Sequence, residues 1–358
     1  MKPRILLAAV TAAAAFAHSA AAAPGLLLGL DDDSLKWYSH TGALLSIYRD
    51  LDLGAVRVTL DWTPGESFPF GTERTELQRA ASGGRSIRIV LAVTGPANEP
   101  PLDPASRASY CGFIANVLAR YPWIRDVAIW TEPNSPRFWQ PQQGGAAAYE
   151  ALLAQCWDTL HAEEPGVNVI ATSSPHGKPA RWYESVGKAY RSSGRTLPIF
   201  DTLGHNAYPQ DSAEPPDTRH AKGPIDEGDL ARLLAALHEA FDGTGQPVPG
   251  ERGVTVWYLE DGFQSSENTF LYSGSETDAD PVSEAEQAAQ LTAAVQLAYC
   301  QPAVGGFFNF ELRDEADLSG WQSGLLRPDW SAKPAFAAYL EALAAARAGT
   351  IACKDSNG

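Results

Sequence analysis

Two glutamates follow short apolar runs and are of the right type to act as an acid and a nucleophile. Glu132 lies in residues 127–134, where Pro133 directly after it forbids a further ladder hydrogen bond. Glu260 ends a second apolar run at 254–260. An acid at the end of a buried parallel strand lies at the C-terminal rim of the sheet. The two carboxyl groups therefore form a candidate catalytic pair.

The chemistry open to such a pair depends on its spacing and on the environment of each acid. Carboxyl groups about 5 to 5.5 Å apart suit a double displacement at a sugar carbon, whereas about 6.5 to 9.5 Å leaves room for an attacking water. One acid must stay protonated near neutral pH and the other must stay charged. Arg57, in the middle of a β-branched run, and a donor such as Tyr208 or His205 would favour the charged form.

The elements that position these residues alternate regularly along the chain. We expect strands at 25–30, 54–62, 88–93, 126–130, 167–171, 200–203, 254–260 and 305–312. We expect helices at 41–52, 106–120, 145–162, 180–191, 230–241 and 283–299. Eight such strand units without an interrupting linker predict an α/β fold, a single-domain (β/α)8 TIM barrel over residues 24–358. A doubly wound open sheet is the main competitor, but it would normally offer a glycine-rich phosphate loop after strand one.

Residues 1–23 have the features of a secretory signal peptide. Lys2 and Arg4 precede a short alanine-rich apolar core that ends in small residues up to Ala23. The run is too short for a membrane span, so we expect a secreted protein, extracellular or periplasmic. Cleavage would take the 27 basic residues to 25 against 43 acidic ones, a net charge of about −18. Such a surface disfavours nucleic acid and anionic lipid as partners, and a neutral partner fits better.

Four cysteines remain after this processing, at 111, 156, 300 and 353. An even count in an oxidising compartment favours two disulfides over free thiols or metal ligands. Of the three possible pairings we favour Cys111 with Cys156, on consecutive helices, and Cys300 with Cys353, which would pin the C-terminal tail.

The segment Trp-Thr-Glu-Pro-Asn at 130–134 resembles the acid/base motif of the retaining glycoside hydrolases of clan A, the 4/7 superfamily of (β/α)8 barrels. Residues 256–264 resemble the nucleophile strand of that clan, and residues 305–336 resemble the closing segment of family 39 and cellulase-like members. The resemblance spans essentially the whole mature chain. It implies that Glu132 is the acid/base and Glu260 the nucleophile.

The same resemblance assigns supporting roles. His205 and Tyr208 are similar to the His-x-x-Tyr-Pro near the end of the sixth strand, and Arg57 is similar to the strand-two arginine that holds the nucleophile. Clan members usually place Asn before the acid/base, where it binds the sugar 2-hydroxyl, but this chain has Thr131 there. Threonine is shorter and offers one hydroxyl, so 2-hydroxyl recognition must be weaker, delegated or different.

The eighth strand also departs from the clan pattern, because it reads Phe-Phe-Asn-Phe-Glu at 307–311 where a Trp is common. Asn309 or Glu311 is then a candidate for sugar contacts, and Trp321 in the following loop is a candidate stacking platform.

Three further residues are candidates for substrate contact, each with a structural alternative. Asn134 either binds sugar or serves as a turn residue after Pro133. Trp139 is the tryptophan we expect to stack on sugar, because we expect its loop to be exposed. His176 follows the fifth strand in a polar loop and is a weaker candidate.

The sequence thus predicts a secreted retaining glycosidase acting on a carbohydrate or glycoside, with no metal site and no organic cofactor. A transglycosidase would use the same pair, and a catalytically silent carbohydrate-binding barrel is the alternative from another class. The sugar, its anomer, endo or exo attack, and the oligomeric state stay open.

Overall fold

The computed structural model describes residues 25–83, 87–267, 269–278 and 280–353. The predicted signal peptide at 1–23 lies outside the described residues. None of the described helices combines the length and the apolar character that crossing a membrane requires.

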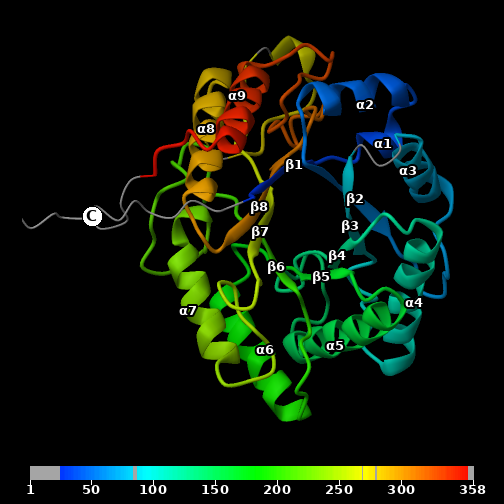
Figure 1. Cartoon of the computed structure of the whole chain (residues 1–358). Coiled ribbons are helices and arrows are strands. Elements are labelled where there is room, and N and C mark those ends of the chain that lie inside the picture. Colours follow the sequence, from blue (N-terminus) through cyan, green and yellow to red (C-terminus); the bar gives the residue numbers. More distant parts are fainter. Residues whose placement is uncertain (1–24, 84–86, 268, 279, 354–358) are drawn as a thin grey trace, which may run out of the picture.

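Eight parallel strands close into one barrel in the order in which they occur along the chain, and β1 pairs with β8 (Figure 1). The strands are β1 Leu27–Asp31, β2 Ala55–Asp61, β3 Arg88–Thr94, β4 Asp126–Ile129, β5 Asn168–Ala171, β6 Thr202–Asn206, β7 Val256–Asp261 and β8 Val304–Phe310. Closure confirms the (β/α)8 barrel and rules out the doubly wound open sheet.

Helices surround the barrel on its outside (Figure 1). They are α1 Ser34–Trp37, α2 Thr41–Asp50, α3 Gly71–Ser82, α4 Pro104–Arg120, α5 Gly145–Glu163, α6 Pro179–Ser193, α7 Leu230–Phe241, α8 Glu284–Tyr299 and α9 Pro334–Ala348, with short 3-10 turns η2 Glu227–Asp229 and η3 Thr269–Leu271. The sequence did not predict α3 or α9. Helix α3 is mostly polar and buries only Glu76, Leu77 and Ala80, so its apolar period is weak.

Local capping explains where two of the predicted helices begin. The Asp103 carboxylate accepts hydrogen bonds from the backbone N–H groups of Ala105 and Ser106, and Pro104 occupies the first turn of α4. Ser283 and Glu286 form a capping box at the start of α8. These caps satisfy N–H groups that the helix itself leaves without partners.

The barrel interior is filled by small side chains from some strands and large side chains from others. Ala92 and Ala128 leave space that Trp257 and Phe308 occupy, and all of these side chains are buried. A Cβ atom at position 306 would lie 2.9 Å from the Trp257 ring, so Gly306 allows the indole to pack against β8. The packed interior closes the barrel below its C-terminal mouth, as in other barrels of this type.

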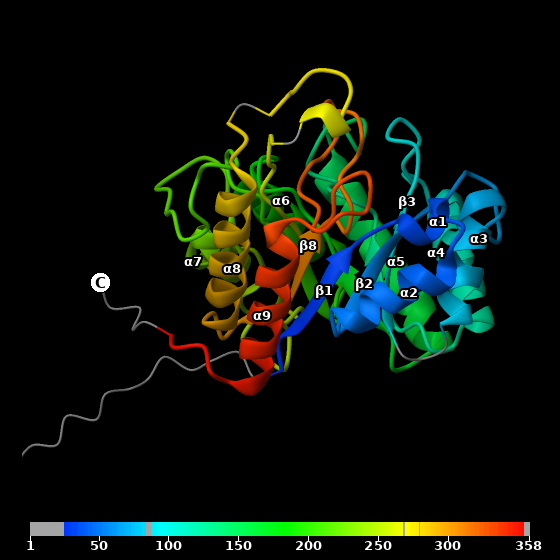
Figure 2. The same cartoon turned by 90° about the horizontal axis from the view of Figure 1, so that it is seen from above.

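Long loops after β7 and β8 rise together on one side of the barrel (Figure 2, yellow and orange). The two loops are joined by a bridge between Ser273 and Asp317 and by a 2.6 Å hydrogen bond from the Tyr272 hydroxyl to Asp314. Lys333 lies 2.8 Å from the Asp314 carboxylate, and both side chains are fully buried. Asp314 is therefore part of the loop scaffold, because a paired buried charge orders the groups around it.

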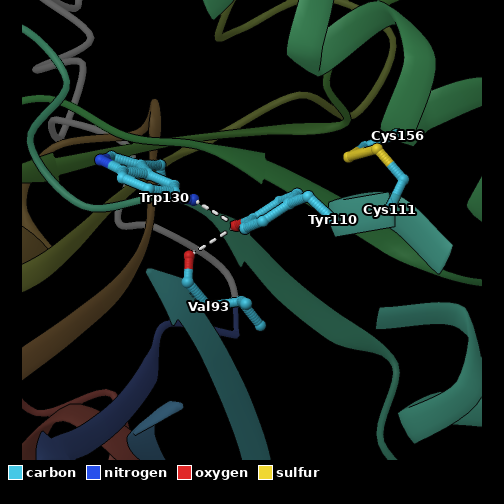
Figure 3. The surroundings of a disulfide bond; sticks show 5 residues. All are labelled: Val93, Tyr110, Cys111, Trp130 and Cys156. Carbon is cyan, nitrogen blue, oxygen red and sulfur yellow. Dashed lines mark hydrogen bonds between the residues drawn. A yellow bond between two sulfur atoms is a disulfide. The ribbon is translucent and has the colours of Figure 1, made fainter. Parts of the chain in front are cut away.

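Two disulfides link the outer layer, with the pairings that the sequence favoured. Cys111 of α4 is bonded to Cys156 of α5, and Cys300 after α8 is bonded to Cys353 in the C-terminal tail. Figure 3 shows Tyr110, beside the first disulfide, between two strand ends. Its hydroxyl donates to the carbonyl of Val93 at 2.6 Å and accepts from the Trp130 N–H at 2.9 Å. Helix α4 is thereby fixed to the segment that carries Glu132.

Removing the first disulfide is expected to cost more stability than removing the second. The loops that they close, of 45 and 53 residues, give similar chain-entropy contributions of about 4 kcal/mol. Cys111 and Cys156 are fully buried, whereas Cys300 and Cys353 are partly exposed. Serines at 111 and 156 would each bury a hydroxyl group, which costs about 1–3 kcal/mol when that hydroxyl has no hydrogen-bond partner.

The comparison is made by urea unfolding of the two double variants, Cys111→Ser with Cys156→Ser against Cys300→Ser with Cys353→Ser. The two double variants serve as controls for each other, because the two disulfides close loops of similar length. An equal or larger loss of unfolding free energy in the 300/353 variant would contradict the ranking.

Candidate active site

Glu260 lies within β7 and both of its carboxylate oxygens are held. Nη1 of Arg57 is 3.1 Å from Oε1, and the Tyr208 hydroxyl donates to Oε2 at 3.2 Å. Burial and then the charge of Glu260 raise the pKa of Tyr208 well above its ordinary value, so the phenol stays protonated and donates. A carboxylate with a cation on one oxygen and a donor on the other is stabilised in its charged form.

Arg57 also forms a close ion pair with Asp31, its neighbour in register at the end of β1. Burial opposes the charge on the guanidinium, but Asp31 and then Glu260 keep the pKa of Arg57 above its ordinary value. Asp31 is a site residue that the sequence interpretation did not assign to the active site. The sequence contains a pattern that could have identified it. Asp31 follows an apolar run, so it lies at the same rim of the barrel as the two glutamates.

Glu132 follows β4 by three residues and has a different environment. Its backbone has φ 38°, and Trp130 two residues earlier has φ 65°, so both sit in the left-handed region that side chains with a Cβ rarely adopt. Such strain persists where the surrounding structure enforces it. The Asn206 amide donates to Oε1 of Glu132 at 2.8 Å.

Burial, and next the negative charge of Glu260, raise the pKa of Glu132 to about 7. The hydrogen bond from Asn206 acts in the opposite direction and stabilises the ionised form. The Glu132 carboxyl group is therefore half protonated near neutral pH, while Glu260 is held by Arg57 and Tyr208. Two glutamates of one cleft thus have unlike environments, which is the arrangement that acid and nucleophile roles require.

The two glutamates line one cleft of ≈ 900 Å³ at the mouth of the barrel. Of the residues predicted from the sequence, the cleft lining includes Arg57, Thr131, Glu132, His176, Tyr208, Glu260 and Trp321. Residues 209–212, from the long loop after β6, form part of its wall. The loop after β6 therefore contributes to the cleft as well as connecting β6 to α7.

One wall of the cleft is aromatic. The Tyr208 and Trp321 rings stack with centroids 5.1 Å apart and an interplanar angle of 28°, and Phe310 meets Trp321 edge-on at 5.3 Å. Trp321 thus lies where a platform was expected from the loop after β8. Aromatic faces of this kind suit the apolar faces of sugar rings.

Five residues predicted to contact substrate lie outside the cleft lining. Trp139 is the clearest correction, because it is fully buried against Trp130 and Tyr149, at centroid distances of 5.4 and 5.9 Å. The expected exposed platform at this position is wrong. The loop itself is largely exposed, as expected, but the Trp139 indole turns inward and packs against the two aromatic rings.

Asn134, His205 and Asn309 are buried, are absent from the cleft lining and are hydrogen-bonded to protein groups. Asn134 exchanges hydrogen bonds with the backbone of Ser174 at 2.7 and 2.9 Å, and Asn309 donates to the carbonyl of Glu311 at 3.1 Å. The His205 nitrogens lie 2.7 Å from the Ser173 hydroxyl and 2.7 Å from the carbonyl of Ile225. Burial lowers the pKa of His205 to about 4, so this ring is a neutral structural group.

Glu311 lines a smaller cavity of ≈ 360 Å³ next to the cleft. The cavity and the cleft share Asp31, Thr59, Phe310 and Glu315. Burial, and next the charge of Asp32, raise the pKa of Glu311 well above its ordinary value. Glu311 therefore lies beside the cleft that Glu132 and Glu260 line, not within its lining.

Asn206 is a second residue that the sequence interpretation missed, although it adjoins His205. The register of β6 against β7 shifts between His205 and Asn206, and Asn206 then pairs with Glu260. Side chains alternate along a strand, so His205 and Asn206 point to opposite faces. Asn206 reaches Glu132, whereas His205 packs outside the barrel.

Asp261, directly after Glu260, is excluded as a competing nucleophile. Its side chain is 1% exposed and does not belong to the cleft lining. Burial raises the pKa of Asp261 to about 8. A protonated, buried carboxyl group is a poor nucleophile.

No protein-family model matches this chain, and no curated protein is similar to it in sequence. Solved structures are similar in fold. A GH5_18 protein from Streptomyces cattleya in complex with GlcNAc has a TM-score of 0.61 at 16% identity, over 93% of this chain and 83% of that one. The GH53 catalytic domain from Ignisphaera aggregans has a TM-score of 0.61 at 14% identity, over 88% and 95%.

A third similar structure is the GH2 beta-galacturonidase from Eisenbergiella tayi, with a TM-score of 0.54 at 14% identity over 87% of this chain. The chain spans 47% of the length of that protein. These likenesses establish the barrel fold shared with several glycoside hydrolases.

The pKa of Glu132 should shift in opposite directions in two variants. Asn206→Ala removes a donor to the ionised carboxylate, so the pKa of Glu132 should rise above about 7. Glu260→Gln removes the neighbouring negative charge, so the same pKa should fall. Carbon-13 NMR titration of the Glu132 side-chain carboxyl measures both. Shifts of the same sign in the two variants would contradict this account of the site.

Proposed function

We propose that this protein is a retaining glycoside hydrolase of the 4/7 superfamily, in which Glu132 is the acid/base and Glu260 the nucleophile. The observation that carries the proposal is the contrast between the two glutamates of one cleft. Glu132 has a pKa raised to about 7, whereas Arg57 and Tyr208 hold both oxygens of Glu260. The fold shared with GH5 and GH53 structures supports the same class.

In the first step Glu260 attacks the anomeric carbon of the bound sugar while the glycosidic C–O bond breaks. Glu132 gives its proton to the departing oxygen, so the leaving group departs as a neutral alcohol. The product on the protein is a glycosyl ester of Glu260. Loss of negative charge from Glu260 lowers the pKa of Glu132, which favours its ionised form for the next step.

In the second step the ionised Glu132 takes a proton from a water molecule. The water oxygen bonds to the anomeric carbon, the ester bond to Glu260 breaks, and the sugar leaves with its original anomeric configuration. Arg57 and Tyr208 then receive the regenerated Glu260 carboxylate. No metal or organic cofactor takes part in either step.

The substrate class that the cleft favours is a neutral glycan or glycoside. The stacked Tyr208 and Trp321 rings offer an apolar platform, and the chain carries a net charge of −16, which disfavours polyanions. Thr131 lines the cleft beside Glu132, so recognition of the 2-hydroxyl rests on a short hydroxyl side chain. We further infer export of the mature chain from residue 24, since two disulfides accompany the signal-like start.

Glutamine variants of the two acids should differ in their dependence on the leaving group. Glu132→Gln should lose about 10²- to 10⁴-fold in kcat/KM on glycosides with poor leaving groups, and much less on activated aryl glycosides, which need little protonation. Glu260→Gln should be inactive on both kinds. A screen of aryl glycosides and polysaccharides identifies the substrate, and NMR of the first product identifies its anomer.

Glu251→Gln is the matched control, because Glu251 is exposed in the loop before β7, away from the cleft lining. It should retain the activity of the parent. A product of inverted configuration, or a Glu260→Gln variant as active as the parent, would overturn the double displacement. Transfer of sugar to alcohols with little hydrolysis would identify a transglycosidase that uses the same pair.

The pH profile should follow the protonated fraction of Glu132. The first step needs its proton, so kcat/KM on a glycoside with a poor leaving group should fall as the pH rises through about 7. The measurement is the basic limb of kcat/KM between pH 5 and 9, ~two units either side of that pKa. Activity that stays level up to pH 9 would contradict Glu132 as the acid.

A further inference from the structure

A second group of ionisable side chains lies in the segment between β6 and α7. Among the described residues, Glu214, His220 and Asp226 bring one potential ligand atom each within 4.8 Å of one another. None of the three lines the catalytic cleft, although residues 209–212 of the same loop do. The group is therefore separate from the Glu132–Glu260 pair but belongs to a loop that walls the cleft.

The histidine of this group is oriented by a fourth residue. Nδ1 of His220 lies 3.1 Å from the Asp229 carboxylate, which also accepts from the His220 backbone N–H at 2.9 Å and from Arg232 at 2.9 Å. With the proton on Nδ1, the lone pair is on Nε2, which lies 3.3 Å from Oε2 of Glu214. Metal-binding histidines typically donate their other N–H to a carboxylate in this way.

Asp226 supplies an independent sign of a missing ligand. It is 4% exposed, and neither of its carboxylate oxygens has a hydrogen-bond partner among the described residues. Its Oδ2 approaches Nδ1 of His220 to 3.1 Å without hydrogen-bond geometry. A buried carboxylate without such bonds is costly.

The next feature of this group is its lack of nearby Lys and Arg side chains. Within the described part of the chain, Glu214 and Asp226 have no Lys or Arg at ion-pair distance, because Arg232 pairs with Asp229. His220 is the common ion-pair neighbour of the two acids. The donors thus comprise one imidazole and two carboxylates.

We propose that Glu214, His220 and Asp226 bind a divalent transition-metal ion, for which Zn²⁺ is the best match. Imidazole with carboxylates suits Zn²⁺, whereas Ca²⁺ takes six to eight oxygen ligands. The ion would join the loop after β6 to the segment that starts η2 and so hold the cleft wall of residues 209–212. The prediction from the sequence was that there is no metal site, because a 214, 220, 226 spacing matches no metal motif.

The test is calorimetry on the EDTA-treated, dialysed mature chain with Zn²⁺, Ca²⁺ and Mg²⁺ added separately. The parent should bind one Zn²⁺ per chain at this site, more tightly than Ca²⁺ or Mg²⁺. Glu214→Gln and His220→Gln should each weaken Zn²⁺ binding by about 10- to 100-fold. Zn²⁺ should raise the melting temperature of the parent but not that of the variants.

His238→Gln is the matched control, because His238 also pairs with a carboxylate, Asp242, at 2.9 Å, but on the exposed face of α7. It should bind Zn²⁺ as the parent does. If His220→Gln fails to fold by circular dichroism, Glu214→Gln decides, since Glu214 lies in a loop. Absence of Zn²⁺ binding, equal binding by parent and Glu214→Gln, or preference for Ca²⁺ would overturn the proposal.

Discussion

The buried guanidinium of Arg57 is the constraint on which the site depends. It lies between Asp31 on β1 and Glu260 on β7, and a buried charge of this kind is tolerated only when it is paired. Barrel closure makes the arrangement possible, since β2, which carries Arg57, lies beside β1 but reaches β7 only across the mouth. The contacts of Glu260 therefore depend on the whole barrel rather than on β7 alone.

Glu260 in turn influences Glu132. Burial, and next the negative charge of Glu260, raise the pKa of Glu132 to about 7. Asn206 limits that shift through its hydrogen bond, so Glu132 stays able to lose its proton as well as to give it. A group that must act as acid and then as base needs both properties. One arginine and one asparagine thus give two chemically identical side chains different behaviour.

Sequence patterns predicted the barrel and the positions of both glutamates for a physical reason. Buried parallel strands are continuous apolar runs, and polar residues at their ends must lie at the rim, so Glu132, Glu260 and Arg57 could be placed together. Residues whose direction depends on tertiary detail could not. Alternation along β6 places His205 and Asn206 on opposite faces, but only the tertiary structure shows that Asn206 reaches Glu132. Packing against Trp130 and Tyr149 likewise buries Trp139.

Buried carboxylates occur throughout the C-terminal half of this acidic barrel, and they are compensated in different ways. Asp314 has Lys333 as a permanent cation. Asp261 is instead kept neutral, because burial raises its pKa to about 8, and it therefore adds little charge beside Glu260. Asp226 lies between these cases, because burial, and next the charge of Asp229, raise its pKa to about 7, and its ion-pair neighbour His220 is a cation only when protonated. A divalent cation bound there, as proposed above, would supply the positive charge that Lys333 supplies to Asp314.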